Sequence, residues 1–131
     1  MPTFTPLIPA TAAANAAEFC YSPGLVVDGW LHISGHIGFA PDGSVPSSRA
    51  EQAENAFRAI GEVLALAGAA FSNVVSLISY HTDDVAENED WFNPIKDSFL
   101  PEPPFPACAA IGVASLAVSG AVVEIAAVAK L

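Results

Sequence analysis

The sequence has few charged residues, and this shortage excludes two classes of partner. Charged side chains make up only 14% of the 131 residues, and four basic residues stand against fourteen acidic ones, for a net charge of −10. A nucleic-acid backbone and an anionic membrane surface would both repel such a chain. We therefore expect no nucleic acid and no membrane among its partners.

Cysteines and long apolar runs are also scarce. The two cysteines, Cys20 and Cys108, have no CxxC spacing, which excludes a disulfide scaffold and favours reduced thiols in a cytoplasmic protein. No apolar run reaches the roughly 18–20 residues of a membrane span. The final Ala129-Lys130-Leu131 resembles a peroxisomal address, which only a source with peroxisomes could read. The alternative is a strand that happens to end this way.

Apolar residues, in contrast, are abundant. They form 53% of the chain, and its length suits a single domain over residues 1–131, without linker or repeat. So few charges on so small a domain indicate that other subunits cover part of the apolar surface.

Local patterns predict six strands. Residues 4–8 suit an edge strand because Pro6 cannot donate to a ladder. Residues 25–27 and 30–37 flank Asp28-Gly29, a hairpin turn, and residues 41–43 form a second turn. Residues 74–80 are mostly apolar and predict an interior strand, and residues 107–113 and 122–129 predict the last two.

Two helices are predicted. Residues 53–67 carry an apolar stripe at helical spacing, with Ser47 or Ser48 as the cap and Gly68 at the end. Residues 88–99 form the second helix, but Pro94 favours the first turn and moves the expected start towards Trp91. The order of elements predicts an α+β fold, a two-layer sandwich whose mixed sheet carries two helices on one face. Because no third helix is predicted, the other face should be covered by oligomerisation.

Several segments, in this order, resemble the Rid/YjgF family, which is also known as RidA-like or L-PSP endoribonuclease-like. The resemblance covers nearly the whole chain. The matching segments are Tyr21-Ser22, Trp30-Leu31-His32-Ile33-Ser34-Gly35-His36-Ile37, Gln52-Ala53-Glu54-Asn55-Ala56, Ala67-Gly68-Ala69, Asn73-Val74-Val75, Tyr80-His81-Thr82-Asp83, Asn88, Phe105-Pro106-Ala107 and Val123-Glu124-Ile125-Ala126-Ala127-Val128-Ala129.

The resemblance implies a chorismate-mutase-like subunit in a homotrimer with three clefts between subunits. Active members hydrolyse an enamine or imine, such as 2-aminoacrylate, to a keto acid and ammonia, without a metal or organic cofactor. In them an arginine holds the substrate carboxylate, a backbone group at the Ser-Gly strand assists, and a glutamate near the C-terminus positions water.

The position of the family's arginine is occupied here by Cys108. A guanidinium offers two parallel donors and a permanent charge, whereas a thiol offers one weak donor. Neither Arg49 nor Arg58 aligns with the site, since both lie on the first predicted helix. We therefore expect weak activity on 2-aminoacrylate.

Other positions retain the family's residues. Glu124 matches the water-positioning glutamate, with one extra residue in the preceding turn, and either acts as a general base in a cleft or points to solvent or an intersubunit donor. Tyr21 matches a cleft-lining tyrosine and either orients a ligand or packs. Gly35 either allows a ligand to approach the backbone or simply ends a strand.

Cys108 itself has three interpretations. It is an inert small hydrophobe, a thiol that contacts the ligand, or a nucleophile, for which His36 beside Gly35 is the one plausible base. No metal site is expected: His32 and His36 are placed on one strand face but too far apart, and His81 is isolated. The acidic residues between 83 and 90 lack EF-hand spacing and suit a solvated helix start.

The sequence thus supports two hypotheses about function. The first is a Rid-like hydrolase that uses Glu124 and a water on a small imine, enamine or related compound in the cleft between subunits. The alternative is a non-catalytic trimer of the same fold that acts as a small-molecule-binding or regulatory protein. Ribonuclease activity, which the family's older name suggests, fits poorly with the charge of −10.

Overall fold

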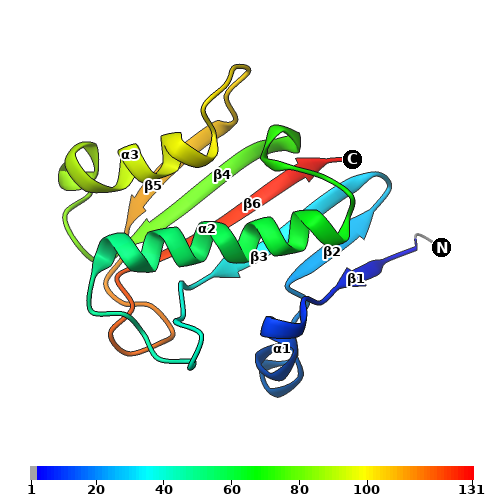
Figure 1. Ribbon diagram of the computed structural model, residues 1–131, viewed down its shortest axis with the longest axis horizontal. Coiled ribbons are helices and arrows are strands. Elements are labelled where there is room, and N and C mark those ends of the chain that lie inside the picture. The colour runs from blue at the N-terminus through cyan, green and yellow to red at the C-terminus, as the bar shows by residue number, and fades with distance from the viewer. Residues whose placement is uncertain (1–2) are drawn as a thin grey trace.

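The computed structural model describes residues 3–131 and builds one mixed sheet with two long helices across one face (Figure 1). The strand order is β1-β2-β3-β6-β4-β5, and only β4 and β5 run parallel. This confirms the predicted two-layer α+β arrangement. The strands are β1 (Thr5–Leu7), β2 (Gly24–Val27), β3 (Trp30–His36), β4 (Val74–His81), β5 (Ala107–Gly112) and β6 (Val123–Lys130), and the helices are α1 (Ala13–Phe19), α2 (Arg49–Leu66) and α3 (Asn88–Phe99).

The predicted hairpin joins β2 to β3. Asp28 and Gly29 both have positive φ angles, 51° and 76°, which is the backbone twist that a two-residue hairpin turn needs. β1 is an edge strand of the sheet. Pro6, which has no backbone N–H to donate, therefore does not interrupt the hydrogen bonds between interior strands. The predictions for these three strands are confirmed.

The long helix α2 supplies most of the helical side of the core. Ser48 caps it, with its hydroxyl accepting from the Glu51 backbone N–H, and the helix ends just before Gly68. Its apolar stripe is buried, and the ring of Phe57 stacks on Phe92 and Phe99 of α3 at centroid distances of 6.0 and 5.0 Å. The sequence prediction for this helix is confirmed.

The third helix in chain order begins earlier than expected. α3 starts at Asn88, so Pro94 lies inside the helix and not in its first turn, which corrects the predicted start near Trp91. The ring removes the N–H that would bond the carbonyl of residue 90. Because Asp90 is exposed, water can satisfy that carbonyl, and the helix continues through the proline.

The Ala-rich segment before β2 forms α1, which the sequence analysis did not predict. The expectation of no third helix is therefore wrong. Ala has the strongest intrinsic helix propensity, and seven residues suffice for two turns. The hydroxyl of Thr11, just before α1, donates to the Glu62 carboxylate on α2, which anchors this end of α1 beside α2.

The sheet face away from α2 and α3 stays accessible in the single chain. We call this the open face; none of its side chains is fully buried, in contrast to their neighbours along each strand, which fill the core. β5 is more exposed than the open face, because all six of its residues are exposed although none carries a charge. The open face is formed by His32, Ser76, Ile78, Tyr80, Glu124, Ala126 and Val128.

The last residues of the chain lie in the sheet. Ala129 and Lys130 belong to β6, and the Leu131 backbone N–H donates to the Gly29 carbonyl at 2.9 Å. The resemblance of this tripeptide to a peroxisomal address stays an untested prediction, as does a cytoplasmic location. Within residues 3–131, none of the helices has the length and apolar character needed to cross a bilayer.

Candidate functional site

Glu124 and Gly35 meet on the open face near one end of the sheet. Glu124 stands on β6, and its carboxylate lies directly over Gly35 of the neighbouring strand β3. A Cβ atom at Gly35 would come within 2.6 Å of Glu124 Oε2 and 2.8 Å of its Cδ. Gly35 is exposed and Glu124 is half-buried, so a small molecule can reach the carboxylate. The structure thus brings together two of the residues predicted from the sequence.

The segment that carries Tyr21 is tied to the same place. The hydroxyl of Ser34, which precedes Gly35, donates to the Ser22 carbonyl at 2.6 Å, and its backbone N–H donates to the Pro23 carbonyl at 3.0 Å. These bonds hold the loop after α1 beside Gly35. Tyr21, 37% exposed, directly precedes Ser22 in that loop, and its role as a cleft-lining residue stays a prediction.

The environment of Glu124 suits a proton acceptor. Burial raises the pKa of its carboxyl above the ordinary range, because the charged form is partly removed from water. Its cross-strand neighbour on β4 is Tyr80, which shares the open face. A carboxylate with a raised pKa, open to a ligand on one side, can take a proton from a bound water.

A β-bulge turns His36 away from this site. The register of β3 against β6 shifts between Ile33 and His36, and His36 ends up paired with Ile125 on the core side. His32 stays on the open face. The expectation that His32 and His36 share a strand face is therefore wrong, since the extra residue of a bulge changes the alternation of side chains. His36 is buried, with 8% exposure, and the sheet separates it from Glu124.

Cys108 lies apart from both Glu124 and the open face. It is exposed on the edge strand β5, where it pairs with Leu77, a core residue, while Glu124 pairs with Tyr80 further along β4. The Cys108 thiol donates to the Pro106 carbonyl at 3.4 Å. Within one subunit the structure brings Cys108 neither to Glu124 nor to His36.

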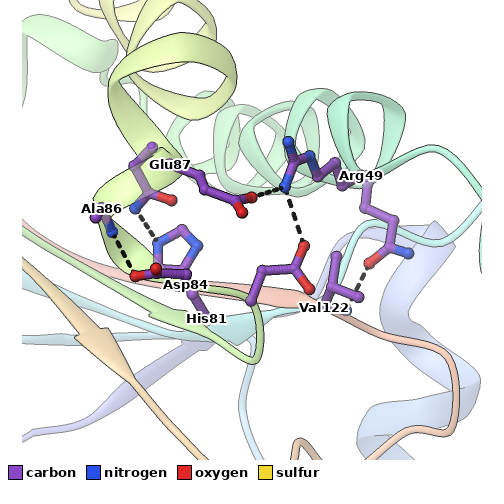
Figure 2. Close-up of polar contacts among 9 residues, drawn as sticks. Arg49, His81, Asp84, Ala86, Glu87 and Val122 are labelled. Atoms are coloured by element: carbon purple, nitrogen blue, oxygen red, sulfur yellow. Dashed lines mark hydrogen bonds and ion pairs between the residues drawn. The ribbon is translucent and has the colours of Figure 1, made fainter.

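Neither arginine of α2 is available as a substitute anchor in the single chain. The Arg49 guanidinium pairs with Asp83 at 3.3 Å and Glu87 at 2.7 Å, as Figure 2 shows, and it lies 4.8 Å from the centre of the Trp91 ring. Arg58 is exposed and faces Glu54 one turn away. Two carboxylates therefore already neutralise Arg49. The acidic residues of this region accordingly serve as ion-pair partners, and Asp84 caps the turn by accepting from the Ala86 N–H.

His81 is the centre of a buried polar cluster, which corrects the expectation that it is isolated. Its Nε2 lies 3.2 Å from Nδ2 of Asn88 (Figure 2). The same nitrogen lies 2.8 Å from the Ser79 hydroxyl, and the ring meets Phe92 edge-on. The residue is fully buried, and burial lowers the pKa of its imidazole. The cluster joins β4 to the start of α3 on the core side of the sheet, away from Glu124.

Two buried histidines make the stability of the fold sensitive to acid. Burial lowers the pKa of both His36 and His81 below 6.5, so the unfolded chain binds more protons as the pH falls below that value. We expect the free energy of unfolding to be constant above about pH 6.5 and to fall below it, by up to about 1.4 kcal/mol per pH unit for each histidine. Urea unfolding at a series of pH values and one protein concentration measures the slope. His36→Asn should remove the part of this slope that comes from His36. A flat profile between pH 6.5 and 5 would contradict the prediction.

Comparison with protein families identifies the family of the chain. The family model described as Endoribonuclease L-PSP matches residues 11–131, which is nearly the whole chain. The chain is a member of the Rid/YjgF family.

Relatives of this Rid/YjgF protein cover most of its length. The RutC family protein YjgH of Escherichia coli (strain K12) is 32% identical over 113 residues, 86% of each chain. The human 2-iminobutanoate/2-iminopropanoate deaminase is 38% identical over 125 residues, 92% of this chain and 86% of that protein. Among solved structures, Protein YJGH superposes with a TM-score of 0.86 at 31% identity, covering 97% of this chain and 95% of that one.

The structure of this Rid/YjgF protein adds two residues that the sequence analysis did not single out. Ser34 links the Tyr21 loop to Gly35 through its hydroxyl, and Tyr80 stands beside Glu124. The register of β4 against β6 puts Tyr80 there, and the sequence carries no signal for that register. A serine before a strand glycine was visible, but its partner, the Ser22 carbonyl, lies twelve residues away.

Proposed function

We propose that this protein hydrolyses a small imine or enamine, with Glu124 as the general base. The observation that supports it most is the half-buried carboxylate over an exposed glycine, where a ligand and a water can both reach it. The human relative is a 2-iminobutanoate/2-iminopropanoate deaminase, and that activity agrees with this chemistry. No metal or organic cofactor is required by the reaction.

The proposed reaction needs one water and one proton acceptor. Glu124 takes a proton from water as the water oxygen adds to the imine carbon, which gives a carbinolamine. Glu124 first returns that proton to the nitrogen, then takes the proton of the carbinolamine hydroxyl and passes it to the same nitrogen, so that the C–N bond breaks and ammonia leaves as the carbon becomes a carbonyl. General-base assistance of this kind contributes about 10²–10⁴-fold to the rate. In this scheme Tyr21 and the backbone at Gly35 orient the substrate.

The substrate preference should differ from that of an arginine-bearing member of the family. Cys108 stands where the family's arginine is expected, and the arginines of α2 are engaged or distant. A thiol cannot offer the charged, bidentate contact that holds an α-carboxylate. We therefore propose a neutral or weakly anionic substrate, and slow turnover of 2-iminopropanoate.

Cys108 can join the site only from another copy of the chain. In one subunit it lies on the edge strand and pairs with a core residue, away from Glu124. β5 carries no charged residue, Glu124 is the one acidic residue among those named for the open face, and both surfaces are accessible, as is typical of surfaces that associate. We propose a homotrimer in which β5 of one subunit borders the open face of the next, so that Cys108 and Glu124 flank one cleft.

The assembly can be tested directly. We expect a stable species of three times the 13.5 kDa chain mass, because the exposed apolar edge strand and the open face need cover. Sedimentation velocity or light scattering at micromolar concentration measures the mass. A mutation that adds charge to β5, Ala109→Glu, should dissociate the assembly, whereas Ala86→Glu on the exposed turn before α3 should not. A stable 13.5 kDa wild-type monomer would refute the intersubunit cleft.

The contact between Gly35 and Glu124 provides a test of the catalytic role. Gly35→Ala places a methyl group where the carboxylate lies, and because the carboxylate is the flexible end of its side chain, it moves and the fold survives. Misplacing a catalytic group by about 1 Å can reduce turnover about 100-fold. We expect a loss of that order in ammonia release from 2-iminopropanoate or 2-iminobutanoate, with an unchanged thermal midpoint. Ala86→Ser on the exposed turn before α3, outside both the open face and β5, is the control. Equal rates for both variants would remove Glu124 from the mechanism.

The alternative is a trimer that binds a small molecule without chemistry. Cys108 in place of the arginine favours it, since loss of the anchor removes the main determinant of deaminase activity. Calorimetric binding of 2-oxobutanoate or a related acid, together with no turnover of any imine in the wild type, would support this alternative. Binding and turnover that are both lost in Gly35→Ala would support the enzyme.

A further inference from the structure

The β-bulge beneath Glu124 carries a buried histidine that the proposed reaction does not use. His36 lies on the core side, directly behind the Ser34–Gly35 backbone on which the Glu124 carboxylate rests. Its Nδ1 is 2.6 Å from the Ser34 carbonyl oxygen. Since a carbonyl only accepts, Nδ1 must be the protonated nitrogen of the ring.

Ser34 is thereby held from three directions. Its carbonyl accepts from His36, its backbone N–H donates to Pro23, and its hydroxyl donates to Ser22. The last two bonds come from the loop that carries Tyr21, and the first comes from inside the core. Ser34 is therefore held from both sides of the sheet, and the carbonyl of its peptide with Gly35 is held by His36.

This peptide forms the surface on which the Glu124 carboxylate rests. The carboxylate lies so close to Gly35 that not even a methyl group fits between them. Any rotation of the Ser34 carbonyl changes the position of the Gly35 Cα, and the half-buried carboxylate must follow. β-Bulges commonly change the direction of a side chain next to a functional site. Here the bulged backbone of Ser34 and Gly35 is the surface that the Glu124 carboxylate contacts.

We propose that His36 is a positioning residue: its Nδ1–H holds the Ser34 carbonyl, which fixes the bulge and with it the Glu124 carboxylate. The inference deepens the proposed function, because it rests on Glu124 being the functional group. His36 contacts neither substrate nor water in this scheme. It acts through the backbone of Ser34 and Gly35 alone.

The neutral ring suits this role. His36 is buried, and within residues 3–131 its Nε2 has no hydrogen-bond partner. Burial lowers the pKa of the imidazole, while the bond to Ser34 and the Glu62 carboxylate on α2 act in the opposite sense. A neutral ring with its proton on Nδ1 keeps the bond to Ser34 and leaves no charge in the core.

Two substitutions separate positioning from mere packing. His36→Asn keeps an N–H donor on the atom attached to Cγ, the place of Nδ1, and cannot titrate. His36→Leu has similar bulk but no donor. If the bond to Ser34 positions Glu124, Asn should behave like the wild type, and Leu should release the bulge while the folded state remains.

The measurement is the titration of Glu124 itself, read from its carboxyl carbon by NMR on glutamate-labelled protein and assigned with Glu124→Gln. We expect wild type and His36→Asn to titrate alike, above the ordinary glutamate value of about 4.3. In His36→Leu the pKa should move down towards that value, because a displaced carboxylate regains water. If imine turnover is present, it should fall at least about tenfold in Leu, with little change in KM, and recover in Asn.

Failure of the inference and failure of the proposed function give different results. A wild type without turnover overturns the function, yet the titration still tests the positioning. An unchanged Glu124 titration in folded His36→Leu, or no recovery in His36→Asn, overturns the role of His36. If the Leu variant does not fold, ¹⁵N NMR of wild-type His36 decides: a proton on Nδ1 with a bare Nε2 supports the inference, and the opposite tautomer overturns it.

Discussion

Replacing Glu124 by glutamine should lower turnover by about 10²–10⁴-fold while ligand affinity changes little. The amide keeps the shape and the contact with Gly35 but cannot accept a proton from water, and the expected loss is the usual contribution of a general base. Steady-state ammonia release and calorimetric binding, measured on the same compound, separate the two effects. The exposed Glu102→Gln, which removes a carboxylate away from the open face, is the matched control.

The same substitution should have a characteristic effect on stability. Burial raises the pKa of Glu124, so the folded protein binds its proton more tightly than the unfolded chain does. The contribution of this tighter proton binding to the free energy of unfolding is present at low pH, and it is lost as the pH rises through the raised pKa of Glu124. Glu124→Gln should therefore stabilise the protein at pH 7 and make little difference below about pH 4. Undiminished turnover, or a variant that is less stable at neutral pH, would contradict the assignment of Glu124 as a buried base.

Introducing arginine at Cys108 should raise kcat/KM for 2-iminopropanoate by about 10- to 100-fold. Hydrogen bonds to charged groups contribute about 1.5–3 kcal/mol, and a factor of ten corresponds to about 1.4 kcal/mol. Cys108 is exposed in the single chain, so a longer side chain can be accommodated at the cleft. Competition assays with 2-iminopropanoate and a neutral imine should show that only the acid gains.

Two further variants at this position sharpen that result. Cys108→Lys supplies the charge without the planar pair of donors and should recover only part of the gain. Cys108→Ser removes the thiol but keeps a small polar group, and it should leave the activity near that of the wild type unless the thiol is a nucleophile. Loss of activity in the serine variant together with no gain in the arginine variant would favour Cys108 as a reacting group.

The fold was largely predictable because its signals are local. The stripe of α2, the Asp28-Gly29 turn and the edge strand with Pro6 each depend on neighbouring residues, and all three were confirmed. The two errors in the helices had different causes. α1 was missed because a run of alanines carries no amphipathic pattern, and the start of α3 was misplaced because the exposure of Asp90, which tolerates Pro94, is a tertiary property.

The candidate site was predicted only in part, because side chains meet across strands. Glu124 and Gly35 came from the family resemblance, and their direct contact depends on the pairing of β3 with β6. The bulge between them inserts one residue, and this reverses the side of the sheet on which His36 lies. No pattern in residues 30–37 reveals such an insertion. The cluster around His81 likewise joins β4 to α3, and no local sequence pattern predicts that these two elements pack together.

The apolar edge strand has a consequence for how the protein behaves on dilution. β5 is held by backbone bonds to β4 alone, and none of its side chains is buried within the subunit. Segments with so few buried contacts open at a low free-energy cost. If subunits cover β5, its amide protons should exchange slowly in concentrated solution and quickly once the subunits separate, while α2 stays protected throughout. The exchange of this one strand would then serve as an internal gauge of the association constant.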